Sequence, residues 1–67
     1  MSRRRTEYLI TVWTGQKSTT YLHTASDAQA AVRAGRRHHA GAVAVEVRRT
    51  LDGPVLATWG SRERRSA

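Results

Sequence analysis

The chain has 67 residues, no cysteine and a formal net charge of +7. This length allows one small domain of marginal stability, and the missing cysteines exclude disulfides and thiolate-bound metal and give no sign of an oxidising compartment. The most apolar stretch, Tyr8 to Trp13, is too short for a signal peptide or a membrane span, so we expect a cytoplasmic protein without membrane contact.

Arginine is concentrated at the two ends of the chain. Residues 1–5 and 61–67 show no apolar periodicity, so we expect a disordered basic N-terminal arm and a disordered basic C-terminal tail around one domain at 6–60. The arm and the tail hold six of the eleven arginines, which leaves the domain only mildly basic. A GC-rich genome would also produce many arginines, alanines and valines, and that explanation involves no function.

The first part of the domain predicts two strands. Thr6 to Thr14 is rich in β-branched and aromatic residues and predicts a strand. Gly15 to Ser18 is a polar connection of hairpin length, and Thr19 to Thr24 predicts the second strand. One face of the first strand carries Tyr8, Ile10 and Val12, and the other carries Glu7, Leu9, Thr11 and Trp13. One face of the second strand carries Thr20, Leu22 and Thr24, and the other carries Tyr21 and His23.

A helix is predicted between Ser26 and Gly41. Ser26 and Gln29 have the spacing of a capping box, Asp27 would lie in the first turn, and Gly41 can close the helix in the left-handed conformation. Gly35 lies on the apolar side, where we expect it to allow close approach to a sheet. That side carries Ala28, Ala31, Val32, Gly35 and His39, and the opposite side carries Arg33, Arg36 and Arg37 beside Gln29.

The last part of the domain predicts a second pair of strands. Ala42 to Thr50 alternates valines with other residues, so Val43, Val45 and Val47 should face the core. The turn signal of residues 51–53 precedes Pro54, which should begin a strand or lie at an edge. Val55 to Trp59 is the fourth strand, and Gly60 ends it.

These elements sum to an α+β fold of the type ββαββ, a four-stranded, mainly antiparallel sheet with one helix on one face. One short helix covers only part of such a sheet, so the second face should be an interface, most simply with a second copy of the chain in a homodimer. The residues expected there are Leu9, Trp13, Tyr21 and Leu56.

Arginines on the outer side of the helix are the main candidates for binding an anion. A helix holds Arg33, Arg36 and Arg37 in a fixed array, although an ordinary solvated helix face would have the same composition. An antiparallel arrangement places the C-terminal tail near this array and the N-terminal arm near Arg48 and Arg49, which makes two basic clusters. The full candidate set for phosphate contacts is Arg33, Arg36, Arg37, Arg48, Arg49, Arg3, Arg4, Arg5, Arg62, Arg64 and Arg65.

Other chemistries have little support in the sequence. The tryptophans and tyrosines can stack on bases, but a chain without phenylalanine needs its tryptophans for the core. His38 and His39 project about 100° apart on a helix, so we expect no metal site and no cofactor. A nucleophile elbow and a phosphate-binding glycine loop are both missing, so no enzymatic activity is expected.

Two functions are therefore predicted. The first is a small non-enzymatic protein that binds nucleic acid, DNA in preference to RNA, through arginine contacts to the phosphate backbone. The alternative is a protein-interaction module, a small regulator or inhibitor of the kind carried by phages or mobile elements, that binds an acidic protein through the uncovered sheet face.

Overall fold

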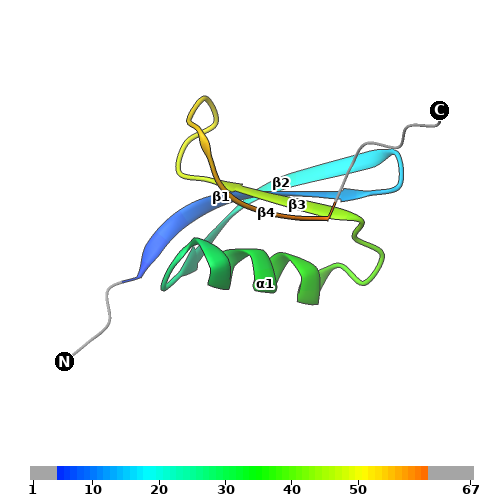
Figure 1. The fold of residues 1–67 in the computed structure, drawn as a ribbon, viewed down its shortest axis with the longest axis horizontal. Helices are drawn as coiled ribbons and strands as arrows, with labels where there is room; N and C mark the ends of the chain where they lie inside the picture. The colour runs from blue at the N-terminus through cyan, green and yellow to red at the C-terminus, as the bar shows by residue number, and fades with distance from the viewer. Residues whose placement is uncertain (1–4, 61–67) are drawn as a thin grey trace.

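In the computed structural model of the chain, residues 5–60 are described, and they form an antiparallel sheet with a single helix along one of its faces (Figure 1). The sheet has four strands in the order β2-β1-β3-β4. The predicted ββαββ fold is confirmed, and the structure adds the strand order. The elements are β1 (Thr6–Thr14), β2 (Lys17–Ala25), α1 (Ala28–His38), β3 (Ala44–Arg48) and β4 (Val55–Gly60).

A two-residue turn joins β1 to β2. Thr14 pairs with Lys17, so only Gly15 and Gln16 lie between the strands, and β2 begins two residues earlier than predicted. Gly15 has a φ of +71° and Gln16 does not have a positive φ, which is the pattern of a type II′ turn. This turn sets an uninterrupted register of paired residues along the whole of β2.

The core lies between the helix and the sheet. Ile10, Val45 and Val47 are fully buried, and Ala31 of the helix is buried against the same cluster. A Cβ added at Gly35 would lie 3.1 Å from Val45 Cγ1 and 3.2 Å from Ile10 Cγ2. The expected close approach of the helix at Gly35 is therefore confirmed.

Both predicted helix ends are wrong in detail. Asp27, not Ser26, is the N-cap, and its Oδ1 accepts a hydrogen bond of 2.8 Å from the Ala30 N–H. Asparagine, aspartate and serine are all good caps, so the local sequence allowed either Ser26 or Asp27 to be the N-cap. At the other end the cap is His39, and Gly41 does not adopt a positive φ.

The strand after the helix covers Ala44–Arg48 and is therefore shorter than the predicted strand over residues 42–50. The alternation of valines is confirmed for Val45 and Val47, which are fully buried, whereas Val43 precedes the strand and is exposed. Between Val47 and Arg48 the pairing with β4 shifts by a residue, as in a β-bulge.

Strand register decides which residues lie on the uncovered sheet face. Tyr21 pairs with the buried Ile10, so it lies on the helix side and packs against the core. The expectation that Tyr21 lines the uncovered face is therefore wrong. Leu9 and Trp13 do lie on that face and are half-buried. No helix within residues 5–60 is long and apolar enough to cross a membrane.

Candidate nucleic-acid interface

The side of α1 that points away from the sheet carries three arginines. Arg33, Arg36 and Arg37 are all exposed, while Val32 and Gly35 face the core. Residues three and four apart in a helix project to the same side, so the guanidinium groups share one surface. No carboxylate within residues 5–60 pairs with any of the three. Their positive charge is therefore uncompensated in this part of the molecule.

Arg36 does not simply extend into solvent. Its guanidinium carbon lies 4.2 Å from the centre of the Trp59 ring, in a cation–π contact. Trp59 comes from β4, on the helix side of the sheet, because it pairs with the buried Val45. The contact therefore joins the last turns of α1 to the edge strand of the sheet.

A cavity of about 380 Å³ opens at this junction. Charged, aromatic and small side chains line it together, so the cavity offers cationic donors beside an apolar surface. Guanidinium groups form short, bidentate hydrogen bonds with phosphate oxygens, which makes phosphate the anion that this lining suits best. The lining residues are Arg33, Arg36, Arg37, His39, Ala40, Ala42 and Trp59.

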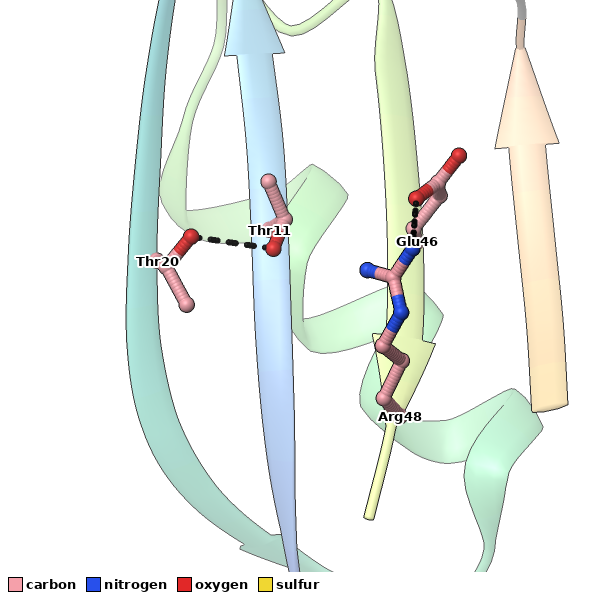
Figure 2. Close-up of polar contacts among 4 residues, drawn as sticks. All are labelled: Thr11, Thr20, Glu46 and Arg48. Atoms are coloured by element: carbon pink, nitrogen blue, oxygen red, sulfur yellow. Dashed lines mark hydrogen bonds and ion pairs between the residues drawn. The ribbon is translucent and has the colours of Figure 1, made fainter. Parts of the chain in front are cut away.

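The second basic cluster lies at the other end of the sheet and is partly neutralised. Arg48 Nη2 forms a salt bridge of 3.1 Å with Glu46 Oε1, on the sheet face away from the helix (Figure 2). Arg5 Nη2 donates to the Thr24 carbonyl oxygen at 3.2 Å, and Arg49 is exposed. Within the domain, the arrangement of two separate clusters is as expected, but Arg48 has a carboxylate partner.

The remaining candidate arginines lie outside the described residues. These are Arg3, Arg4, Arg62, Arg64 and Arg65. The predicted disordered arm and tail, apart from Arg5, also lie there.

The three histidines gather where β2 meets the end of α1. The His23 and His38 rings form an edge contact with centroids 6.0 Å apart, and the Tyr21 and His39 rings lie 5.7 Å apart. Within residues 5–60, no group of three metal-ligating side chains lies close enough to hold a metal ion. These rings therefore pack the helix end against the sheet.

Sequence reasoning missed Trp59 and His39 as part of the arginine surface. The signal for Trp59 was present, since the alternation of β4 places it on the same face as Ala57. What the sequence lacked was the position of β4 beside the end of α1. Comparisons of the chain with protein-family models, with curated proteins and with solved structures gave no match.

Proposed function

We propose that this chain is a small, cytoplasmic, non-enzymatic nucleic-acid-binding protein whose main contact surface is the outer side of α1. The observation that carries the proposal is the set of three guanidinium groups, without a carboxylate partner in the described domain, around the cavity beside Trp59. Each arginine would neutralise a backbone phosphate and release its counterions.

The arrangement favours backbone contact over base readout. Arg33 and Arg37 lie about 6 Å apart along the helix axis, so they can reach neighbouring phosphates of one strand. Phosphate contacts position a protein on nucleic acid without reading sequence. We therefore expect binding that tolerates most sequences, with duplex DNA preferred over RNA.

The test is binding to a mixed-sequence DNA duplex and an RNA duplex of equal length, measured by fluorescence anisotropy between about 50 and 200 mM salt. Affinity should fall steeply with salt. The double variant Arg33→Ala with Arg37→Ala should weaken binding to all sequences and reduce the slope of log K against log salt by about 2. This double variant keeps the cation–π contact between Arg36 and Trp59.

A matched control removes the same charge elsewhere. The variant Lys17→Glu also lowers the net charge by two, but Lys17 is exposed, does not line the cavity and is not one of the candidate phosphate contacts. It should keep most of the affinity and of the salt slope. Equal losses in the arginine double variant and in Lys17→Glu would mean that net charge alone attracts nucleic acid. Absence of binding at the lower salt would overturn the proposal.

A second candidate is the protein-interaction module, and the uncovered sheet face supports it. Leu22 is 58% exposed and Leu56 is 46% exposed, and the half-buried Leu9 pairs with Leu22. An acidic protein that docks on this face would lose affinity with the neutral substitution Leu56→Ser and keep most of it with Arg33→Ala. Nucleic-acid binding through α1 would show the reverse.

A further inference from the structure

The two edges of the sheet differ in how well they are protected from pairing with another strand. The β4 edge follows Pro54 and contains a register shift opposite Val47 and Arg48, and both features discourage a new partner strand. The β2 edge is nine residues long, contains no proline and no bulge, and has its single charge, Lys17, at one end. β2 is thus a long, regular and open edge.

The hairpin determines which backbone groups of β2 point outward. A two-residue turn is closed by a hydrogen-bonded pair, here Thr14 and Lys17, and bonded and non-bonded pairs then alternate along an antiparallel ladder. The outward N–H and C=O groups therefore belong to the non-bonded positions. These are Ser18, Thr20, Leu22 and Thr24.

A side-chain contact supports this alternation. Thr11 and Thr20 form a pair of the non-bonded kind, in which the side chains are closer, and their Oγ1 atoms lie 3.0 Å apart (Figure 2). At the end of the strand, the Arg5 guanidinium already occupies the Thr24 carbonyl oxygen. The free outward groups are thus those of Ser18, Thr20 and Leu22, with Thr20 in the middle.

We propose that β2 pairs with β2 of a second copy of the chain, antiparallel, about a twofold axis at Thr20. Thr20 would then face its own counterpart, and each Ser18 would face the other copy's Leu22. Three residue pairs form, each exchanging two N–H···O=C bonds, and all use groups that have no strand partner within residues 5–60. The result is one continuous eight-stranded sheet.

A second copy suits this edge because the strand is complementary to itself. The two Lys17 side chains lie at opposite ends of the paired segment, so pairing brings no like charges together. Pairing also covers part of Leu22, the most exposed large apolar side chain within a strand. This interface differs from the sheet-face interface expected from the sequence, because it uses the edge of the sheet.

The symmetry has a consequence for the arginine surface. Antiparallel strands in one sheet are related by an axis perpendicular to the sheet, so both α1 helices lie on the same face of the dimer. The two sets of Arg33, Arg36 and Arg37 then face the same side, where one long duplex can contact both. The dimer itself does not depend on the proposed function, since it is measured without nucleic acid.

The first test is the mass of the full chain by sedimentation equilibrium. We expect twice the chain mass of 7.5 kDa. Thr20→Pro removes an outward donor and should give a folded monomer, since proline is tolerated where an edge N–H faces solvent. Thr58→Pro is the matched control. Thr20 pairs with Thr11, Thr11 with Glu46 and Glu46 with Thr58, so Thr58 is the equivalent position at the β4 edge. The Thr58→Pro variant should remain a dimer.

Two further variants make the result independent of proline. Thr11→Ala removes the same Thr11–Thr20 hydrogen bond without touching the edge, so it should remain a dimer. Thr20→Cys should oxidise to a disulfide-linked dimer, because residues facing each other in a hydrogen-bonded pair have Cα atoms about 5.5 Å apart, within disulfide range. Thr58→Cys should not.

The chain has no cysteine of its own, so each cysteine variant carries a single thiol. A wild-type chain that stays monomeric at millimolar concentration would overturn the proposal. So would equal cross-linking of Thr20→Cys and Thr58→Cys, or a dimer that Thr20→Pro does not dissociate.

Discussion

The Arg36 guanidinium lies over the Trp59 ring, 4.2 Å from its centre, and so joins the end of the helix to an edge strand. This contact holds one arginine of the proposed phosphate-binding surface in place. The same residue pair therefore serves both stability and the candidate site.

We predict a measurable coupling between Arg36 and Trp59. In a double-mutant cycle of Arg36→Ala and Trp59→Leu, the interaction free energy should be about 0.5–1 kcal/mol, as for cation–π pairs near the surface. Urea unfolding followed by circular dichroism gives the four stabilities. Additive losses in the double variant would show that the two groups do not interact in solution.

Alanine substitutions at Gly35 and Gly41 should change the stability of the protein in opposite directions. At Gly35 the new Cβ would press on Val45 and Ile10, both fully buried, and overpacking of about 1–3 kcal/mol should exceed the roughly 1 kcal/mol gained in helix propensity. A Cβ added at Gly41 would have no atom within 4 Å, and the φ of Gly41 is not positive. Gly41→Ala should therefore raise the free energy of unfolding by about 0.4–1 kcal/mol. Thermal unfolding measures both; a stabilised Gly35→Ala would contradict the close packing.

The helix cap is tested by comparing Asp27 with Ser26. Asp27→Ala removes the acceptor of the Ala30 N–H and should cost about 1 kcal/mol of unfolding free energy. Ser26→Ala should change it by less than about 0.5 kcal/mol, as expected for an exposed position. If chemical denaturation shows a larger loss for Ser26→Ala than for Asp27→Ala, Ser26 is the cap, as in the capping box expected from the sequence.

Tyr21 should make the protein less stable at alkaline pH. Burial raises the pKa of Tyr21 above its usual 10.0, and the buried hydroxyl has no hydrogen-bond partner in the described part of the chain. The unfolded chain therefore ionises first, so ionisation of this residue does not change stability below about pH 10 and lowers stability as the pH rises above it.

The variant Tyr21→Phe isolates this effect. It removes an unpaired buried hydroxyl, so stability near pH 7 should be unchanged or higher. The fall in melting temperature between about pH 9 and 11 should also be smaller than in the wild-type chain. An identical pH profile in the two proteins would show that Tyr21 ionises freely in the folded state.

Local patterns in the sequence predicted much of the fold. The bounds of β1 match the prediction, because a run of β-branched and aromatic residues favours a strand whatever surrounds it. Gly35 on the apolar side of the helix indicated close contact with the sheet, and the contact distances confirm it. The candidate arginines of α1 were also predictable, since helical periodicity places them on one side.

Other features depended on contacts between distant parts of the chain. Alternation divides β2 into two faces but does not say which face is covered, and a shift of one residue exchanges them. The register of the β1–β2 pair places Tyr21 opposite Ile10, and the packing of α1 on that face makes it the covered one. The bulge in the β3–β4 pairing likewise has no local signal.

The sequence by itself thus determined the element types, their order and the outward side of the helix, because these follow from interactions between residues near one another in the chain. Only the tertiary structure decided the strand order, the unprotected β2 edge and the pairing of Arg36 with Trp59. These depend on packing between segments that are distant in sequence, and the burial of Ile10, Val45 and Val47 against α1 selects one arrangement among those that the local patterns allow.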